Sequence, residues 1–332
     1  MNPVVYCTPL LFPVIATLGM ILGGLWSWVL PVVVFGLVPL VELKITGAAE
    51  DQSSIPGSNS QAHRWVLYLT LPLTIATALV LQYKVSVDAL SWLELAGGVL
   101  STGIVLGGLG INVGHELGHS RSPFERNLAK ALLCVTLYMH FFIEHNRGHH
   151  KNVATDEDPA SSRRGESVYP FWFRSVLGGW MSAWRIDAKQ MTRFQLIQLA
   201  VSICVFGFFG WQAGLAWVVA SMLGILLLET VNYVEHYGLR RLKRANGRYE
   251  RVRPVHSWNA DHPLGRALLF ELTRHADHHA NAGRSYATLR HLGQAPQLPT
   301  GYPGMIMAAL FPPLFFALMH PRLDAQIARA AS

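Results

Sequence analysis

The sequence contains few charged residues and few cysteines for its length. Asp, Glu, Lys and Arg make up 14% of its 332 residues, and cysteine occurs three times. Ordinary soluble domains carry about a quarter charged residues, so the composition argues against one. Cys7, Cys134 and Cys204 are scattered along the chain, two of them in apolar segments. This pattern excludes a disulfide framework and a thiolate metal site, and indicates small hydrophobic side chains.

Nothing in the sequence resembles a nucleic-acid-binding module, although the net charge is +7. The positive charge is concentrated at residues 120–193 and 240–329, and the segments expected on the far side of the membrane carry almost none beyond Lys84. Such asymmetry is the positive-inside pattern of membrane proteins. We therefore expect a multi-pass protein of the bacterial inner membrane, with both basic regions and both termini in the cytoplasm. The first apolar segment lacks the features of a signal peptide, and we expect it to be a membrane span.

Long apolar runs are what the sequence has in abundance. A helix of roughly 20 apolar residues crosses the hydrocarbon core of a bilayer. The run at 194–233 is long enough for two crossings at about 1.5 Å per residue, and residues 210–214 break it. A polar, turn-rich loop is expected at 50–62. The fold class is thus an all-α integral membrane protein with six transmembrane helices, at residues 9–30, 31–45, 65–83, 90–112, 194–210 and 215–233.

Histidine is the other abundant feature, with 15 residues. Nine of them form three clusters and one isolated site: His115 and His119; His145, His149 and His150; His275, His278 and His279; and His236. Because positions i, i+3 and i+4 of a helix share one face, each cluster is expected to direct its imidazoles at one point. Imidazole binds iron, copper, zinc and nickel, and nine such ligands are too many for one ion. The sequence therefore predicts two metal ions.

The apolar segment 128–143 is almost long enough to cross the membrane. If it crossed, the first two histidine clusters would lie on opposite membrane faces and would not share a metal centre. We therefore expect an interfacial or re-entrant helix with His145 at its exit. All nine histidines then face the cytoplasm, in a helical cap formed by residues 113–193 and 234–332. The apolar segment 305–319, broken at its prolines, is expected to pack against this cap.

Two other metal functions fit parts of the pattern. The stretch from His115 to His119 matches the zinc-protease motif His-Glu-x-x-His, but a protease has no use for the other clustered histidines. A histidine-rich metal transporter needs ionisable residues inside its spans, and these spans carry very few. Non-haem iron with neutral histidine ligands at a membrane face is instead a setting for O₂ activation.

The chain resembles the integral-membrane alkane 1-monooxygenases, within the wider class of histidine-rich membrane di-iron desaturases and hydroxylases. The most specific stretch is Asn232-Tyr-Val-Glu-His236-Tyr-Gly-Leu239, which is not expected in plain fatty-acyl desaturases. Residues 144–162, 256–262, 274–281 and 298–304 are also similar. The chain departs from the family pattern at Ser120, Ala276, Ala282 and Gly283, and none of these departures removes a ligand.

The resemblance implies a single membrane-embedded domain of desaturase/hydroxylase type over residues 1–332, with all nine clustered histidines as ligands of two non-haem iron ions. The implied reaction inserts one atom of O₂ into the terminal C–H bond of an n-alkane that enters from the membrane lipid. The products are a primary alcohol and water. A xylene or toluene methyl-group monooxygenase is the alternative with the same ligands, and a lipid desaturase fits the signature less well.

Electrons for such a reaction have to come from another protein. The chain has no Cys-x-x-Cys pair and no dinucleotide-binding fingerprint. The resemblance implies a rubredoxin donor, itself reduced by an NAD(P)H-dependent reductase. Rubredoxins are typically acidic, which makes the basic cytoplasmic surface a candidate docking patch. Its residues are Arg240, Arg241, Lys243, Arg244, Arg248, Arg251 and Arg253.

Further residues are expected to support the metal centre and the substrate path. A metal-bound imidazole usually donates its other N–H to a carboxylate or carbonyl. The candidates for this role are Asp158, Glu235, Asn232, Glu116, Glu144 and Asp277, with His256 and His262 as further supports. His63, His140, His291 and His320 are interpreted as ordinary histidines. Candidate residues lining the substrate cavity are Trp26, Trp28, Phe35, Leu37, Leu40, Leu106 and Ile111.

Overall fold

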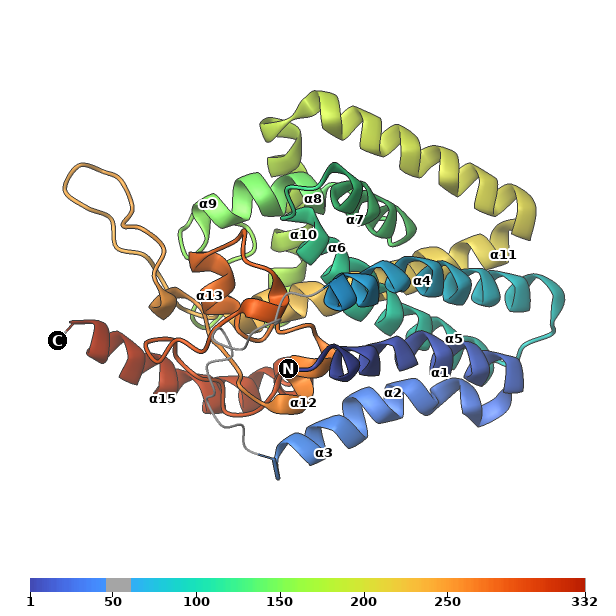
Figure 1. Ribbon diagram of the computed structural model, residues 1–332, viewed down its shortest axis with the longest axis horizontal. Helices are drawn as coiled ribbons and strands as arrows, with labels where there is room; N and C mark the ends of the chain where they lie inside the picture. Colours follow the sequence, from blue (N-terminus) through green and yellow to red (C-terminus); the bar gives the residue numbers. More distant parts are fainter. Residues whose placement is uncertain (46–60, 332) are drawn as a thin grey trace.

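The computed structural model describes residues 1–45 and 61–331, and the regular elements of these residues are helices, with two isolated β-bridges. The described helices include five that are long and apolar enough to cross a membrane. Their bounds are Pro3–Leu22, Gly24–Glu42, Gln61–Val87, Trp92–Gly118 and Ala188–His236. They form one end of the molecule, and shorter helices gather at the other (Figure 1). The prediction of an all-α, multi-pass membrane protein is confirmed.

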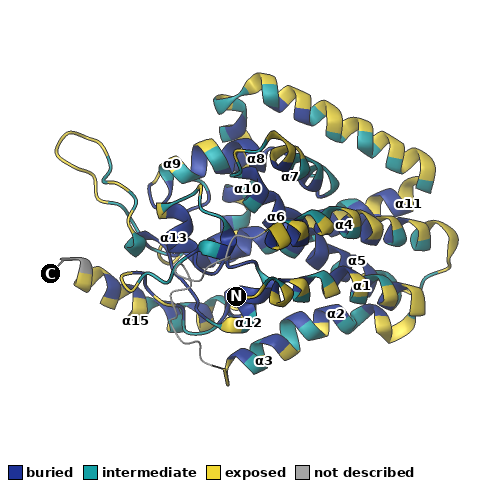
Figure 2. Ribbon diagram, viewed as in Figure 1, coloured by how far each residue is buried: buried dark blue, intermediate teal, exposed yellow. Residues whose placement is uncertain are grey.

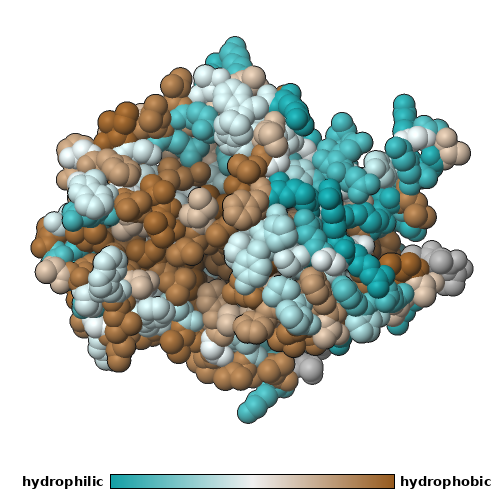
Figure 3. All heavy atoms as spheres, turned by 180° about the vertical axis from the view of Figure 1, so that it is seen from behind, coloured by the Kyte–Doolittle hydropathy of each residue, from teal (hydrophilic) through white to brown (hydrophobic). Residues whose placement is uncertain are grey.

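The apolar surface follows this division. Exposed large hydrophobic side chains are numerous on the membrane helices, among them Leu25, Phe208 and Trp211. Seen from behind, the bundle end is covered mainly by hydrophobic residues and the opposite end mainly by hydrophilic ones (Figure 3). Exposure of such a large apolar surface to water would be unfavourable. Lipid is therefore the environment that fits it.

The first two membrane segments meet at a glycine turn. The first consists of η1 (Pro3–Leu10) and α1 (Leu11–Leu22), and the second of η2 (Gly24–Trp28), α2 (Val29–Val32), η3 (Val33–Leu37) and α3 (Val38–Glu42). Gly23 and Gly24 have φ angles of 72° and 55°, which glycine adopts without steric cost. The predicted boundary between residues 30 and 31 is therefore wrong. Pro31 lies in the first turn of α2, where a helix tolerates proline.

The next two membrane helices lead into the histidine region. α4 (Gln61–Val87) begins at the end of the predicted polar loop, whose residues 50–60 lie outside the described part of the chain. α5 (Trp92–Val105) opens with a capping box between Ser91 and Glu94 and continues through η4 (Leu106–Ile111) into α6 (Asn112–Gly118). η4 is a π-helix, a rare form that occurs frequently at functional sites.

The longest helix, α11 (Ala188–His236), bends at Gly210. This residue has a φ of 82° and a ψ of 169°, so it interrupts the helix within the predicted break at 210–214. Figure 1 shows that the two arms fold back on each other. The arm before Gly210 is largely exposed, whereas the arm after it is largely buried (Figure 2). The predicted division of this run is thus confirmed, and six crossings of the membrane remain our proposal.

The segment 128–143 is not one helix. α7 (Pro123–Val135) ends at a turn in which Leu137 has a φ of 56° and the Tyr138 amide donates to the Leu133 carbonyl at 2.8 Å. This left-handed closure ends the helix, and the chain turns before α8 (Phe141–Glu144). The expectation of a single interfacial helix is therefore wrong. The turn nevertheless brings the second histidine cluster back toward α6, as the shared metal centre requires.

The remaining helices form the cap over the histidines. They are η5 (His145–His149), α9 (His150–Asn152), α10 (Val168–Ile186), η6 (Pro254–His256), α12 (Pro263–Leu268), α13 (His275–Ala280), η7 (Tyr286–Thr288), α14 (Tyr302–Ala309) and α15 (Pro312–Ala331). Phe315 of α15 packs against Tyr233 and Tyr237 at the end of α11, and Met305 belongs to the same buried cluster. The expectation that this tail packs against the cap is confirmed.

Buried polar contacts fasten the cap to the membrane helices. The Arg266 guanidinium forms an ion pair with Glu271 at 2.7 Å, and both side chains are buried. Glu271 also accepts a hydrogen bond from the hydroxyl of Tyr6 in η1 at 2.6 Å. Glu42, at the end of α3, accepts from the amide of Gly265 in α12 at 2.8 Å. The two ends of the molecule are therefore tied by groups that have no access to water.

We predict that Arg266→Met destabilises the protein by about 3 kcal/mol, because the buried Glu271 carboxylate loses its nearest cation and keeps only the Arg274 guanidinium at 3.5 Å and the Tyr6 hydroxyl. Thermal unfolding in detergent measures the effect. Arg322→Met is the matched control, since Arg322 is exposed on α15. A loss no larger than that of the control would contradict the prediction.

Candidate metal centre

The nine clustered histidines converge from five elements at the junction of membrane helices and cap. α6 carries His115 and ends at His119, and α11 ends with His236. The other six lie on η5, α9 and α13. Their ligand atoms form two groups, within each of which all atoms lie within 4.8 Å of one another. The larger group is His115, His119, His145, His150 and His278, and the smaller is His149, His236, His275 and His279.

This division differs from the expectation that each cluster directs its imidazoles at one point. The second cluster contributes His145 and His150 to one group and His149 to the other. The physical reason is the π-helical turn of η5, because a π-helix aligns residues five apart rather than four. The third cluster also divides: His275 and His279, four residues apart on α13, share the smaller group, and His278 joins the larger.

The spacing of the nitrogens fits metal ions. In the larger group, the Nε2 atoms of His115 and His278 are 2.9 Å apart, and those of His119 and His145 are 3.1 Å apart. In the smaller group, the Nε2 atoms of His236 and His275 are 3.2 Å apart. Metal–nitrogen bonds of about 2.0–2.1 Å place neighbouring ligand atoms about 3 Å apart. The donors therefore surround spaces of the size that a transition-metal ion occupies.

Burial keeps the imidazoles in the form that binds metal. Loss of hydration holds the pKa values of His145, His150 and His278 well below the ordinary value of histidine. The same cause lowers the pKa of His119 to about 4. Neutral imidazoles have a free nitrogen lone pair, so no proton competes with a metal ion for these ligands near neutral pH. The larger group can thus hold one ion, and burial likewise lowers the pKa values of His275 and His279 in the smaller group.

Asp158 lies where the sequence placed it, behind a ligand histidine. Its carboxylate is 2.9 Å from Nδ1 of His149 and accepts a further hydrogen bond from the Ser161 hydroxyl. Burial alone would lower the pKa of His149, but the Asp158 carboxylate raises it above its ordinary value. The contact keeps the proton on Nδ1 and turns Nε2 toward the smaller group.

Glu235 takes a different position from the one expected. Its Oε2 atom is 3.2 Å from Nε2 of His275, the nitrogen that faces the other ligands, and not from the outer nitrogen. The Tyr302 hydroxyl donates to the other carboxylate oxygen at 2.8 Å. Glu235 therefore lies beside the space enclosed by the smaller group.

Of the other expected supports, the backbone of His256 hydrogen-bonds His236, and the four carboxylate and amide candidates contact other groups. Asp277 binds Arg290 and Asn281, and Glu116 accepts from the Tyr286 amide. Glu144 lies against Gly148. Asn232 reaches the carboxylate of Glu229. His256 and His262, like His63, His140, His291 and His320, lie outside both groups.

Glu229 is a buried acid that the sequence analysis missed. It sits on the buried arm of α11, and the Tyr138 hydroxyl donates to it at 2.7 Å. The hydroxyl of Ser175 is a second donor. An ionisable residue within an apolar span is itself a signal of function, and Glu229 lies seven residues before His236. That signal was present in the sequence.

An apolar hollow lies among the membrane helices and cap segments that carry the histidines, and none of the nine histidines lines it. It has a volume of about 50 Å³ and its walls come from α1, η3, α5, η4, α6, α11, α14 and the segment before α13. Asn112 and Leu272 line it, each three residues before a ligand histidine, and Val231 lines it five residues before His236. Both π-helical turns of the membrane helices also contribute, through Phe35 and Gly108.

Of the residues expected to line a substrate cavity, Phe35 lines this hollow. Trp26, Leu37 and Leu40 are exposed on the second membrane segment. Leu106 and Ile111 are fully buried in the helix packing, and the Trp28 indole donates to the Leu93 carbonyl. None of these six lines the hollow. These six side chains instead lie on faces of the transmembrane helices that contact lipid or neighbouring helices.

Comparison with known proteins gives a consistent result. The fatty acid desaturase family model matches residues 90–309. Alkane 1-monooxygenase 2 of Pseudomonas aeruginosa is 40% identical, over 94% of this chain and 88% of that protein. Alkane 1-monooxygenase 1 of Alcanivorax borkumensis is 39% identical, over 90% of this chain and 78% of that protein.

A more distant relative is the xylene/toluene monooxygenase hydroxylase component XylM of Pseudomonas putida. It is 28% identical, over 93% of this chain and 86% of that protein. The two histidine groups, the membrane helices that carry them and the extent of these matches agree. The chain belongs to the fatty acid desaturase family and, within it, to the alkane 1-monooxygenases.

Proposed function

We propose that this protein hydroxylates the terminal carbon of n-alkanes, using O₂, two non-haem iron ions and electrons from a rubredoxin. The observation that carries the proposal is the pair of histidine groups, carried in part by membrane helices that also enclose an apolar hollow. Relatives named alkane 1-monooxygenase over most of the chain support it. An n-alkane partitions into the hydrocarbon of the bilayer, so a hollow among the membrane helices is where it would enter.

The donor set supports iron. The two groups contain imidazole and no thiolate, whereas structural zinc sites favour cysteine. Five ligands in one group exceed the four of a tetrahedral zinc site. When bound, iron supplies the one-electron and O₂ chemistry that protein side chains lack. All nine histidines would hold it, five around one ion and four around the other.

The reaction consumes one alkane, one O₂, two electrons and two protons, and yields one primary alcohol and one water. A methyl C–H bond has no useful acidity, so the chain's task is positioning and the exclusion of water. Phe35, Leu228 and Ile306 would hold the alkane chain by apolar contact. Asp158 would fix the orientation of His149 through its Nδ1–H. The buried walls keep bulk water from the space beside the ligands.

We place the metal centre and both termini on the cytoplasmic side of the bacterial inner membrane. The basic segments 120–193 and 240–329 support this orientation, because positive loops stay on the cytoplasmic side. A rubredoxin and its NAD(P)H-dependent reductase would reach the centre from the same side.

We predict that the purified protein, with rubredoxin, its reductase, NAD(P)H and O₂, converts octane and hexadecane to primary alcohols and contains about two irons per chain. With ¹⁸O₂, the alcohol should carry one labelled atom. Toluene is tested beside the alkanes. Benzyl alcohol with no alkanol would replace the proposal with the aromatic activity, an alkene product would indicate a desaturase, and no oxidised product from the iron-loaded protein would refute it.

Asp158→Asn should weaken iron binding by about 10–100-fold, because the amide no longer stabilises the Nδ1–H of His149 as a carboxylate does. Iron retained after titration with a chelator measures the change. Asp156→Asn is the matched control, because Asp156 is exposed two residues away. Equal iron retention in both variants would show that the Asp158 contact does not support the centre.

Gly108→Leu should shift the substrate preference toward shorter alkanes. A Cβ at Gly108 meets no atom within 4 Å, so the leucine would extend into the hollow. We expect the hexadecane-to-octane product ratio to fall about tenfold. Gly36→Leu is the control, because Gly36 is on η3 and does not line the hollow. An unchanged ratio in Gly108→Leu would separate the hollow from the substrate path.

A further inference from the structure

One ligand histidine is accessible from the protein surface through two hollows. Seven of the nine histidines are buried, and His119 and His150 are half-buried. His119 lines a hollow of about 440 Å³ and also a neighbouring hollow of about 320 Å³. Its Nε2 faces His145 at 3.1 Å inside the larger histidine group. The same imidazole ring thus contacts the metal centre on one side and the surface on the other.

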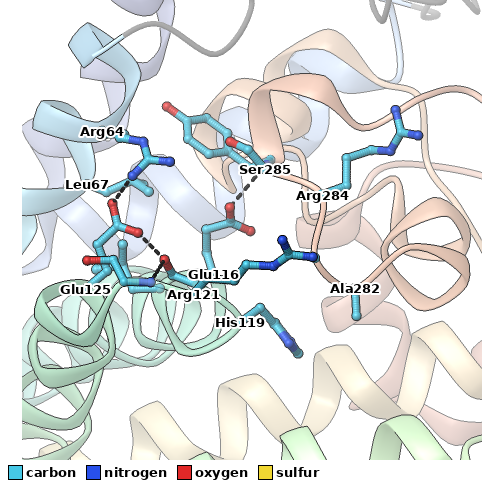
Figure 4. A pocket seen from close by; sticks show the side chains of 14 residues that line it. Arg64, Leu67, Glu116, His119, Arg121, Glu125, Ala282, Arg284 and Ser285 are labelled. Atoms are coloured by element: carbon cyan, nitrogen blue, oxygen red, sulfur yellow. Dashed lines mark hydrogen bonds and ion pairs between the residues drawn. The ribbon is translucent and has the colours of Figure 1, made fainter.

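The two hollows form one continuous depression. Both are lined by His119 and Ser120, and both by Ala282 and Gly283 from the loop after α13. A Cβ at Gly283 would meet no atom within 4 Å, so the wall shared by the hollows is low and open. Figure 4 shows His119, Arg121, Ala282 and Arg284 around the first hollow. A convex partner would approach His119 closely at this point.

Arginine dominates the charged lining of the depression. Arg64, Arg121 and Arg284 line the first hollow, and Arg126 and Arg147 line the second. The acidic residues that line the hollows are already engaged. Glu125 forms an ion pair with Arg64 at 2.8 Å and accepts from Tyr68 and Ser120, and Glu116 accepts from the Tyr286 amide.

The exposed charge that remains is positive. The side chains of Arg121 and Arg126 are exposed beside His119. A surface of this kind attracts an acidic partner and increases its association rate.

We propose that this depression, and not the basic segment 240–253, is the docking surface for the electron donor, an acidic one-electron redox protein of the rubredoxin class. Its electrons enter the metal centre through His119. Each reduced donor passes from Fe²⁺ to Fe³⁺ and releases one electron, so two donor molecules supply the two electrons of one turnover. The inference rests on the proposed function, because a hydroxylase of this kind needs an external donor.

Three of the seven basic residues of the segment 240–253 make side-chain hydrogen bonds or ion pairs within the protein, as Arg147 and Arg284 of the depression do with Asp187 and Asp277. Arg241 donates to the carbonyls of Glu250 and Lys151 at 2.7 and 2.9 Å. Arg253 forms an ion pair with Glu250 at 3.1 Å, and Arg240 lies 3.8 Å from Asp156. None of the seven basic residues of this segment lines either hollow.

Charge reversal separates the two surfaces. The double variant Arg121→Glu, Arg126→Glu is compared with Arg244→Glu, Arg248→Glu, which reverses two exposed charges of the basic segment. We expect the first pair to raise the apparent KM for rubredoxin at least tenfold at low salt with little change in kcat, and to weaken its salt dependence. An increase in KM confined to the second pair, or an equal increase in both, would overturn the proposal.

A steric test is independent of charge. Gly283→Trp would fill the low wall between the hollows, and Gly293→Trp is the control at another exposed glycine, where an added Cβ would also meet no atom within 4 Å. We expect Gly283→Trp alone to slow reduction of the metal centre by rubredoxin in stopped-flow absorbance. Iron content establishes that both variants are assembled. Equal reduction rates in the two variants would contradict the assignment.

Two further measurements distinguish other outcomes. If charge reversal leaves rubredoxin KM unchanged but abolishes stimulation by vesicles of phosphatidylglycerol, the depression binds lipid headgroups and the proposal is wrong.

The unsubstituted protein is also reduced with dithionite and a mediator before alkane and O₂ are added. Absence of alcohol there refutes the proposed function, whereas alcohol formation with rubredoxin KM values insensitive to Arg121 and Arg126 refutes the docking surface alone.

Discussion

Nine imidazoles converge in two groups, with neighbouring ring nitrogens about 3 Å apart, and the rest of the molecule is arranged around this convergence. Neutral ligands would leave the charge of a bound metal ion nearly uncompensated, so the nearest carboxylates would have large effects. Asp158 lies behind His149, and Glu235 lies beside His275. The ligands come from both membrane helices and cap. The centre is therefore intact only while the cap stays fastened to the bundle, which explains the buried ties through Glu42 and Glu271.

Much of this architecture was predictable from the sequence because its signals are local. Apolar runs have a length set by the bilayer, and Gly210 interrupts one of them as expected. The requirement that the first two clusters share a centre argued against a crossing helix at 128–143, and the structure divides this segment between α7 and α8. The residues of the candidate site were also predictable, because closely spaced histidines have few other uses. The structure brings all nine of them into the two groups. That they bind iron follows from the proposed function.

The remaining features depend on conformations that residue type specifies weakly. The first membrane turn is at Gly23, but Pro31 offered an equally good boundary on sequence alone. The end of α7 depends on the left-handed conformation of Leu137, and no turn motif in the sequence predicts it. The π-helical turn of η5 divides the second cluster between the groups, and helical periodicity assumed an α-helix. Glu235 contacts an inner nitrogen because tertiary packing with Tyr302 decides where its carboxylate points.

The buried arm of α11 has a consequence for how such a protein diversifies. Leu228 and Val231 form the wall of the apolar hollow, and His236 follows on the same rigid helix. A substitution that tilts this arm to admit a new substrate also displaces a ligand. Changes of substrate range are therefore expected to be epistatic with residues such as Tyr302 and Phe315 that hold the end of the arm. Walls on other helices, such as Gly108 of η4, are where evolution can alter specificity without disturbing His236.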